Sequence, residues 1–255
     1  MCGFCVWINL DKKVDTSILE KATNLLNHRG PDSNNAIYYA NNKLIYKNNI
    51  VKNNSNITLG MSHRRLSIID TSNNSNQPML SKDEKFTFAY NGEVYNYIEL
   101  RKNMNISEVQ TNGDTEVLFK LLINNEYNIL NKVNGMWAFA FFDKENKKLI
   151  LSRDRFGKKP LFYYQDEKNF VVASEIKVIF KIIQKDRLIN NDFLAYFLLN
   201  KRWPNDCNNS TFYKDIKSIE AGEVMSLDIN TFEKEYAKHN ISLHYKKIID
   251  SFKKN

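Results

Sequence analysis

Cys2 is the residue whose type and position first suggest chemistry. If Met1 is removed, the mature chain begins with a cysteine that carries both a thiol and a free α-amine. An α-amine titrates near ~8 and a thiol near ~8.5, so at neutral pH the amine can accept the proton of the thiol beside it. One residue would then supply nucleophile and base. Taken alone, Cys2 is better explained as a buried structural cysteine.

Cys2 and Cys5 also form a C-x-x-C spacing, which is typical of redox and zinc sites. Either site would need a second pair of ligands or a thioredoxin-like βαβ unit, and the sequence offers neither. Cys207 is distant, and His239 and His244 lie in a polar tail. We therefore expect no metal site, and we interpret Cys5 as a small apolar core residue.

The Asn91-Gly92 step allows two interpretations. Between the apolar run Phe86–Tyr90 and Glu93–Tyr95, it predicts a tight turn joining two strands. Alternatively, a side-chain amide and a backbone N–H could point at one place and form an oxyanion hole. Such donors stabilise the tetrahedral intermediate of acyl transfer, typically by ~3 kcal/mol each. Taken alone, the turn is the better interpretation.

Three charged residues have the chemistry to hold an amino acid. The planar guanidinium of Arg65 can bind a carboxylate through two parallel hydrogen bonds. Glu93 and Asp114 can hold an ammonium group. Each residue also has a plainer interpretation, since Arg65 suits a solvated strand end, Glu93 an exposed strand position and Asp114 a helix cap.

The elements that must position these residues are mostly short strands. Strands are expected at residues 1–10, 36–46, 57–69, 136–142, 149–153, 161–164, 170–174, 216–219 and 224–227. Helices are expected at 16–27, 114–124, 175–183 and 191–200, with His28–Asp32 as a loop. The strands outnumber the helices and follow one another like hairpins, which favours an α+β fold with antiparallel sheets.

Composition and charge restrict the class of protein. The 255 residues are 42% hydrophobic, but no apolar run is long enough to span a bilayer, and the N-terminus does not match a signal peptide. Three cysteines are too few for a disulfide framework, so we expect a cytoplasmic protein. The net charge is +8, but the lysines are scattered, and we expect neither nucleic acid nor membrane as a partner.

Taken together and in this order, the features resemble the class II glutamine amidotransferase domain, whose nucleophile is N-terminal. Within it they are most similar to the N-terminal half of glutamine-hydrolysing asparagine synthetase. The ordered set spans about residues 2–180. The matching stretches are Cys2–Phe4, His28–Asp32, Arg65–Asp70, Gln77-Pro78, Tyr90–Asn96, Gly113–Glu116, Asn134–Phe139, Arg153–Tyr163 and Ala173–Lys177.

The resemblance implies a four-layer αββα sandwich of two antiparallel sheets, which is an Ntn-hydrolase-like fold. It implies the hydrolysis of glutamine to glutamate and ammonia. The implied catalytic residues are Cys2 (nucleophile), Asn91 (side-chain amide) and Gly92 (backbone N–H). The implied glutamine-binding residues are Arg65 (α-carboxylate), Asp114 helped by Glu93 (α-ammonium), and the backbone of Ile68 and Ile69. The His28–Asp32 loop lies near the glutamine site, without individual roles.

The sequence departs from the family in two ways. Cys5 stands where the family usually has Gly or Ala, and we hypothesise that oxidation could link it to Cys2. All eight glycines are isolated, so the chain contains no Ser-Gly-Gly-x-Asp-Ser loop of the kind that opens an ATP-using synthetase domain. We expect an amidotransferase domain over residues 1–185. Residues 186–255 resemble the linker-like lead-in to a synthetase domain that is absent.

The leading hypothesis is therefore a free-standing glutaminase subunit. It would supply ammonia for asparagine synthesis or a related amidation, with a separate ATP-dependent synthetase chain acting in trans. No cofactor is expected in this chain, because ATP and Mg²⁺ would bind the missing synthetase domain. The alternative is a truncated or split gene product that folds and binds glutamine or a partner but has no catalytic role.

Overall fold

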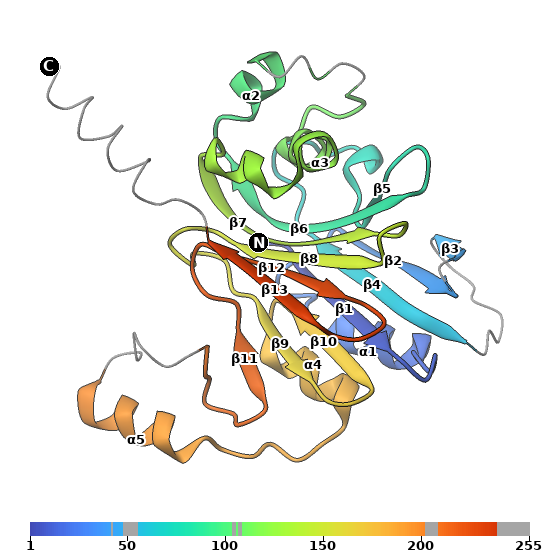
Figure 1. Cartoon of the computed structure of the whole chain (residues 1–255). Coiled ribbons are helices and arrows are strands. Elements are labelled where there is room, and N and C mark those ends of the chain that lie inside the picture. The colour runs from blue at the N-terminus through green and yellow to red at the C-terminus, as the bar shows by residue number, and fades with distance from the viewer. Residues whose placement is uncertain (42, 48–55, 104–105, 107–108, 202–208, 239–255) are drawn as a thin grey trace, which may run out of the picture.

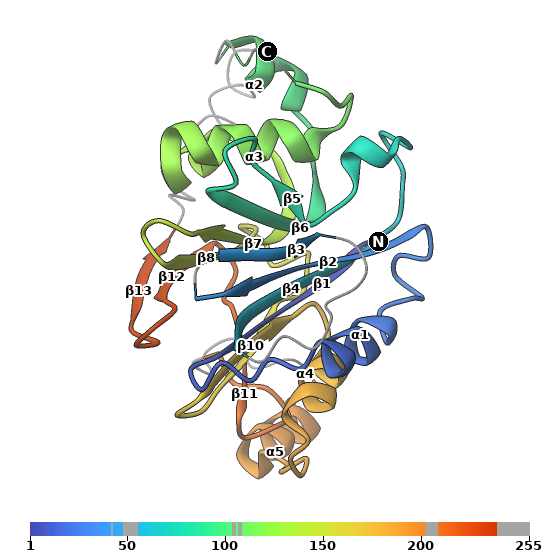
Figure 2. The same ribbon diagram turned by 90° about the vertical axis from the view of Figure 1, so that its right-hand side faces the viewer.

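The computed structural model describes residues 1–41, 43–47, 56–103, 106, 109–201 and 209–238. Over these residues two antiparallel sheets pack face to face, and helices cover both outer faces (Figure 1). The view in Figure 2 shows the four layers one above another. The expected αββα sandwich is confirmed. Cys207, His239, His244, most of the polar loop at 203–210 and most of the charged tail lie outside the described residues.

The first sheet has seven described strands, and β1 lies at its centre between β10 and β4. In order across the sheet, the strands are β11 (Ile216–Ser218), β9 (Phe162–Gln165), β10 (Asn169–Ala173), β1 (Gly3–Asn9), β4 (Ile57–Arg65), β2 (Ser33–Ala40) and β3 (Lys43–Lys47). Cys2 therefore immediately precedes a central strand.

The second sheet has six described strands. In order across it, they are β13 (Lys234–Lys238), β12 (Glu223–Asp228), β8 (Lys148–Arg153), β7 (Gly135–Asp143), β6 (Phe86–Val94) and β5 (Met79–Leu80). β6 pairs with β7 along its whole length, from Phe86 opposite Asp143 to Val94 opposite Gly135. β5 is much shorter and pairs only with Thr87 and Phe88 of β6.

The helices form the two outer layers (Figure 2). α2 (Tyr97–Asn103) and α3 (Asp114–Asn125) cover the second sheet, and α1 (Thr16–Asn24) and α4 (Ile176–Ile183) cover the first. The other helical segments of the described residues are α5 (Asn191–Asn200) and the short 3-10 turns η1 (Asn73–Ser75) and η2 (Glu126–Asn131).

β1 explains why the molecule has separate core layers. Successive side chains of a strand point to opposite faces. Phe4, Val6 and Ile8 enter the core between the two sheets, and Cys5 and Trp7 enter the core beneath α1 and α4. Burying an apolar side chain of this size contributes roughly 1.5–3 kcal/mol. A third core lies between α3 and the second sheet, so each of the three layer interfaces has its own apolar contacts.

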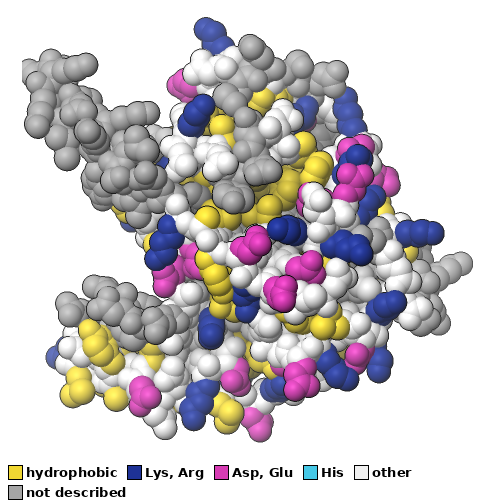
Figure 3. Space-filling model, in the orientation of Figure 1, with side chains coloured by type: hydrophobic (Ala, Val, Ile, Leu, Met, Phe, Trp, Pro, Cys, Tyr) yellow, Lys and Arg dark blue, Asp and Glu magenta, His cyan; other side chains and the backbone are white. Residues whose placement is uncertain are grey.

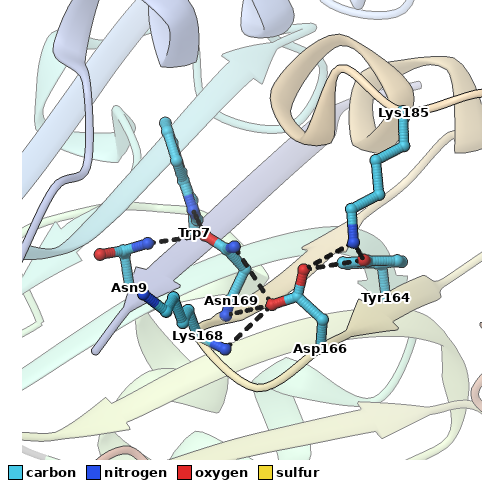
Figure 4. A network of polar contacts seen from close by, with 7 residues as sticks. All are labelled: Trp7, Asn9, Tyr164, Asp166, Lys168, Asn169 and Lys185. Carbon is cyan, nitrogen blue, oxygen red and sulfur yellow. Dashed lines mark hydrogen bonds and ion pairs between the residues drawn. The ribbon is translucent and has the colours of Figure 1, made fainter. Parts of the chain in front are cut away.

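The β9–β10 turn is fastened by a polar network (Figure 4). Asn169 Oδ1 accepts hydrogen bonds from Trp7 Nε1 at 3.0 Å and from Asn9 Nδ2 at 2.8 Å. The carboxylate of Asp166 accepts from Lys185 Nζ at 3.0 Å. Partial burial acts to raise the pKa of Asp166, but Lys185 and the neighbouring donors outweigh it and lower that pKa. The network ties the turn to β1 and to the residues after α4.

Two of the expected strands have different limits. The strand expected at 36–46 is the hairpin of β2 and β3, because the chain turns at Asn41, whose φ of +49° lies in the left-handed region that Asn tolerates. The strand expected at 57–69 ends at Arg65. The next residues leave the sheet to line a pocket. The short β5 and α2 and the lysine-rich β13 were not predicted.

The segment after residue 185 contributes to both sheets. β11 pairs with β9 in the first sheet, and β12 pairs with β8 in the second. The described strands of this segment therefore belong to the same two sheets as the strands before it. No helix of the described residues is both long enough and apolar enough to cross a membrane.

Candidate active site

The residues predicted to do chemistry lie around one pocket of about 160 Å³. Its lining includes every predicted site residue, namely Cys2, Arg65, Ile68, Ile69, Asn91, Gly92, Glu93 and Asp114. A larger cavity of about 650 Å³ beside it has no cysteine in its wall and shares only Gln77 with the smaller pocket. We therefore take the smaller pocket as the candidate active site.

The thiol of Cys2 is held by the backbone of Leu66, the first residue after β4. The Leu66 N–H donates to Cys2 Sγ at 3.3 Å, and the thiol donates to the Leu66 carbonyl at 3.6 Å. Burial raises the pKa of the Cys2 thiol, although the Leu66 hydrogen bond and the charge of Arg65 act in the opposite direction. The resting thiol therefore keeps its proton and needs a base before it can attack.

The loop His28–Asp32 holds the chain around Cys2. Arg29 Nε donates to the Cys2 carbonyl at 2.9 Å, and Arg29 Nη1 pairs with Glu175 at 3.0 Å. Asp32 accepts a hydrogen bond from Ser67 N–H at 2.7 Å. The loop therefore holds the backbone at Cys2 and, on the other side of the thiol, the backbone next to Leu66.

The Asn91-Gly92 step is part of the continuous strand β6, so the predicted tight turn is wrong. Asn91 lies opposite Ala138 and Gly92 lies opposite Trp137 in an unbroken register with β7. A glycine is needed here because of close packing and not because the chain turns. A Cβ on Gly92 would lie 2.4 Å from the Met136 carbonyl oxygen and 2.6 Å from the Tyr90 ring. Only glycine fits between this neighbouring strand and the ring.

Beyond β5, the backbone groups on the outer edge of β6 bind side chains instead of another strand. Tyr90 N–H donates to Gln77 Oε1 at 2.7 Å, and Val94 N–H donates to Asp114 Oδ2 at 2.8 Å. Alternate residues of a strand direct their N–H groups to the same edge. The N–H of Gly92 therefore points to this edge between the other two, and the described residues supply no acceptor for it.

The side-chain amide of Asn91 is a second donor without a partner. Asn91 is 1% exposed, and its Nδ2 makes no hydrogen bond with the described residues. A buried amide without a partner costs roughly 1–3 kcal/mol. The Asn91 amide is therefore free to donate to an acceptor that enters the pocket. Asn91 Nδ2 and Gly92 N–H are thus two donors at the pocket without a partner among the described residues, and their role as an oxyanion hole stays a prediction.

Arg65 is buried at the end of β4 and already anchors the loop that follows. Its Nη1 donates to the Ser72 carbonyl at 2.9 Å and to Asn76 Oδ1 at 3.1 Å, and its Nη2 donates to the Asp70 carbonyl. A guanidinium has five N–H donors. Two of them, on Nε and Nη2, have no partner among the described residues and are available to a carboxylate in the pocket.

The two acidic residues differ in their surroundings. Asp114, the first residue of α3, is 5% exposed and accepts hydrogen bonds from Val94 N–H and from Tyr90 OH at 2.9 Å. Burial raises the pKa of Asp114, although these two hydrogen bonds act to lower it. Glu93 is partly exposed on β6. Ile68 and Ile69 are exposed at the rim. The roles predicted for these residues stay predictions.

Lys159 is a pocket residue that sequence reasoning did not single out. It is 5% exposed, and its ammonium group has no hydrogen-bond or ion-pair partner among the described residues. Burial lowers the pKa of Lys159, as does Arg29, while Cys2 and Glu93 act to raise it. A lysine before a proline carries no local signal of burial, so only the fold reveals this cation beside the thiol.

The hypothesis of a Cys2–Cys5 disulfide does not fit the structure. Both thiols are free, and Cys5 is fully buried within β1. Residues three apart in an extended strand are separated by roughly 10 Å, because the rise is about 3.3 Å per residue. A disulfide requires Cα atoms within about 7 Å, so linkage would require unfolding the start of β1. Cys5 is an apolar core residue, as predicted.

Comparison with known proteins defines the class of this chain. The model of the glutamine amidotransferase domain family matches residues 1–238. The chain belongs to this family, and the resemblance inferred from its motifs is confirmed. The enzyme class is therefore that of a glutamine amidotransferase domain.

Among the described residues, no cluster of three His, Cys, Asp or Glu side chains has the arrangement of a metal site.

Two of the relatives are named asparagine synthetases. A protein of Methanocaldococcus jannaschii, provisionally named asparagine synthetase (glutamine-hydrolyzing) 2, is 32% identical over 249 residues, which are 91% of this chain and 45% of that protein. Asparagine synthetase (glutamine-hydrolyzing) 2 of Bacillus subtilis is 30% identical over 245 residues, which are 94% of this chain and 30% of that protein. The chain thus spans less than half the length of either relative.

A solved structure has the same fold. The glutamine phosphoribosylpyrophosphate amidotransferase from B. subtilis is 19% identical and superposes with a TM-score of 0.64. The match covers 94% of this chain and 50% of that one. At this identity the likeness concerns the fold alone, and it agrees with the Ntn-hydrolase-like sandwich expected from the sequence.

Proposed function

We propose that this chain hydrolyses glutamine to glutamate and ammonia, with Cys2 as the nucleophile after removal of Met1. The observation that supports this proposal is the composition of a single pocket. It combines a thiol, a buried amide donor without a partner, an arginine with spare donors and two carboxylates. Each is a group that the hydrolysis of an amino-acid amide requires.

In the proposed reaction, the α-amine of Cys2 takes the thiol proton, and the sulfur attacks the side-chain amide carbon of glutamine. The oxygen of the tetrahedral intermediate accepts hydrogen bonds from Asn91 Nδ2 and Gly92 N–H. Collapse of the intermediate breaks the C–N bond, and the proton from the amine leaves with ammonia. Water then cleaves the thioester, which yields glutamate and restores the thiol.

The same proposal assigns the two ends of the substrate. Arg65 binds the α-carboxylate through the donors on Nε and Nη2, since a guanidinium matches the planar geometry of a carboxylate. Asp114, helped by Glu93, binds the α-ammonium group. Ile68 and Ile69 are among the lining residues, and their backbone would line the bound glutamine.

We further propose that the ammonia is used for asparagine synthesis or a related amidation. A separate ATP-dependent synthetase chain would act in trans and bind ATP and Mg²⁺, in a cytoplasmic setting. The names of these two relatives support this proposal. The exposed apolar side chains of α5 also support it (Figure 3). Leu198 is 65% exposed and Leu199 is 84% exposed, as is common for surfaces that contact another protein unit.

The test is mass analysis of the purified N-terminus together with a glutaminase assay. We expect the mature chain to begin at Cys2, and we expect Cys2→Ala to hydrolyse no glutamine. Undiminished hydrolysis by Cys2→Ala would show that the nucleophile is wrong. Binding of glutamine without hydrolysis by the wild-type chain would instead support the non-catalytic module. Adding a candidate synthetase chain tests the partner, because amidation of the acceptor from glutamine requires both chains.

A further inference from the structure

The outer edge of β6 is completed by two side chains that the proposed reaction does not use. Gln77 Oε1 accepts from Tyr90 N–H at 2.7 Å, and His63 Nε2 lies 2.9 Å from the Tyr90 carbonyl oxygen. Together they satisfy both backbone groups of Tyr90, as a neighbouring strand would. Tyr90 immediately precedes the two proposed oxyanion donors, Asn91 and Gly92.

His63 reaches Tyr90 from the opposite sheet. It belongs to β4, where it pairs with Phe4 of β1, and it is fully buried. The Tyr90 carbonyl can only accept, so His63 Nε2 carries the hydrogen, and Nδ1 has no partner among the described residues. Burial lowers the pKa of His63 to about 4. The ring is therefore neutral, and its single N–H is committed to Tyr90.

Gln77 approaches the same residue, Tyr90, from the loop before β5. It is 3% exposed and lines the candidate active site. Its amide oxygen is aimed at the backbone, so it offers no group to a substrate through that atom. Gln77 belongs to the Gln77-Pro78 pair that matched the family pattern, and His63 lies two residues before the matched stretch Arg65–Asp70, yet neither carries a role in the proposed reaction.

We propose that His63 and Gln77 are positioning residues, which hold the backbone of Tyr90 and so aim the Asn91 amide and the Gly92 N–H at the oxyanion. The Tyr90 carbonyl and the Asn91 nitrogen share one planar peptide unit, so fixing the carbonyl fixes the start of Asn91. Catalytic groups must be held within roughly 0.5 Å. A misplacement of about 1 Å can cost ~100-fold in rate. The inference rests on the proposed function.

The test compares His63→Leu with His63→Gln. Leucine removes the donor, whereas glutamine can keep an N–H near the position of Nε2. We expect His63→Leu to lower kcat for glutamine roughly 10- to 100-fold with little change in KM, because the oxyanion forms only after binding. His63→Gln should recover most of kcat. The alkylation rate of Cys2 by iodoacetamide, which needs no oxyanion hole, should be the same in both variants.

A second variant guards against a folding defect. Gln77→Met has a similar shape and lacks the acceptor, and we expect it to lower kcat in the same way. In the Asn91→Ala background, the further loss caused by His63→Leu or Gln77→Met should shrink, because the group being positioned is already gone. Losses that multiply in full in that background would overturn the inference, as would a wild-type kcat in both single variants.

The two proposals fail in different ways. If the wild-type chain hydrolyses no more glutamine than Cys2→Ala does, the proposed function is wrong. If the wild-type chain is active and Cys2→Ala is not, but His63→Leu and Gln77→Met keep full kcat, only the positioning role is wrong. A rise in KM at constant kcat would also overturn it, since that pattern indicates lost ground-state binding.

Discussion

Cys2 Sγ lies 3.3 Å from the backbone nitrogen of Leu66, so the candidate nucleophile is held by the chain as it leaves β4. The pairing of β1 with β4, with Gly3 opposite Arg64, brings these residues together. Leu66 is followed by the loop that Arg65 anchors at Asp70, Ser72 and Asn76. The nucleophile and the substrate clamp therefore depend on one short stretch of backbone.

Replacing Arg65 tests whether this residue binds glutamine in addition to anchoring its own loop. We expect Arg65→Ala to raise KM for glutamine strongly, roughly 10- to 100-fold, because one end of the substrate loses charge-assisted hydrogen bonds worth about 1.5–3 kcal/mol each. Steady-state kinetics measure this. Arg64→Ala is the matched control, since the Arg64 guanidinium binds Asn24 and does not line the pocket. An unchanged KM with a lower kcat would show that Arg65 is not the clamp.

Gly92→Ala tests the close approach of β6 and β7. A new Cβ would lie 2.4 Å from the Met136 carbonyl, so the strands must separate. Overpacking of this kind costs about 1–3 kcal/mol. Urea unfolding should show that loss. Gly113→Ala is the control, because its Cβ would have no neighbour nearer than 3.5 Å, and we expect its stability to change by less than ~0.5 kcal/mol. Equal effects of the two variants would contradict this account.

The sequence predicts the elements whose stability is local or strongly patterned. β1 is recognisable because Phe4–Ile8 is apolar at every position, and α3 because its apolar residues recur at helical spacing. The Asn91-Gly92 step was misread because Asn-Gly is the strongest short signal of a hairpin. Pairing of the whole of β6 with β7 overrides that local preference.

Other features depend on contacts distant in the chain and carry no local signal. β13 is rich in lysine, and its strand conformation comes from pairing with β12. The sequence placed Cys2, Arg65 and Asp114 in one site only through the ordered set of motifs that resembles the family, because each residue alone had a plainer interpretation. Lys159 was missed, since its burial results from the way distant elements close over it.

Asp114→Asn should separate stability from substrate binding. Burial raises the pKa of Asp114 above its ordinary value of 3.8, so the folded protein holds this proton more tightly than the unfolded chain does. The stability gained from the protonated form is lost as pH rises through the raised pKa. At neutral pH the buried, ionised carboxylate therefore lowers the free energy of unfolding. An asparagine oxygen can still accept from Tyr90 and Val94.

We therefore expect the free energy of unfolding of Asp114→Asn at pH 7 to equal or exceed that of the wild type, while KM for glutamine rises. In the wild type, KM should begin to rise on acidification at a pH higher than an exposed aspartate would give. Chemical unfolding at pH 7 and KM between pH 4.5 and 7 measure both effects. A destabilised variant with an unchanged KM would reverse the assignment.

Cys5 should be unreactive toward thiol reagents and oxidants in the folded protein. It is fully buried, and burial raises the pKa of its thiol, whereas Cys2 lines an open pocket. We expect iodoacetamide to label Cys2 and to leave Cys5 unmodified in the folded protein. Mass spectrometry after mild oxidation should detect no Cys2–Cys5 link, and Cys5→Ala should lose glutaminase activity under oxidation at the same rate as the wild type. Detection of the link would show that β1 opens at its start.

Lys159→Met should change the pH dependence of the reaction. The burial of the N-terminal amine is the main cause that lowers its pKa, and the charges of Arg29 and Lys159 act in the same direction. We expect this influence to persist when the amine moves to Cys2. Without the lysine charge, the pKa of the amine rises, so more of the base is protonated at neutral pH. The acidic limb of kcat/KM for glutamine should then shift to higher pH, with activity near pH 7 reduced.

Lys158→Met is the matched control for Lys159→Met, because Lys158 is the adjacent lysine and is exposed. It removes the same charge from the chain without changing the pocket, and solvent screens its effect on the amine. The measurement is kcat/KM for glutamine across pH 5 to 9 in the three proteins. An acidic limb that moves equally in both variants would show a general charge effect. A limb that stays in place in Lys159→Met would show that the amine of Cys2 titrates independently of this lysine.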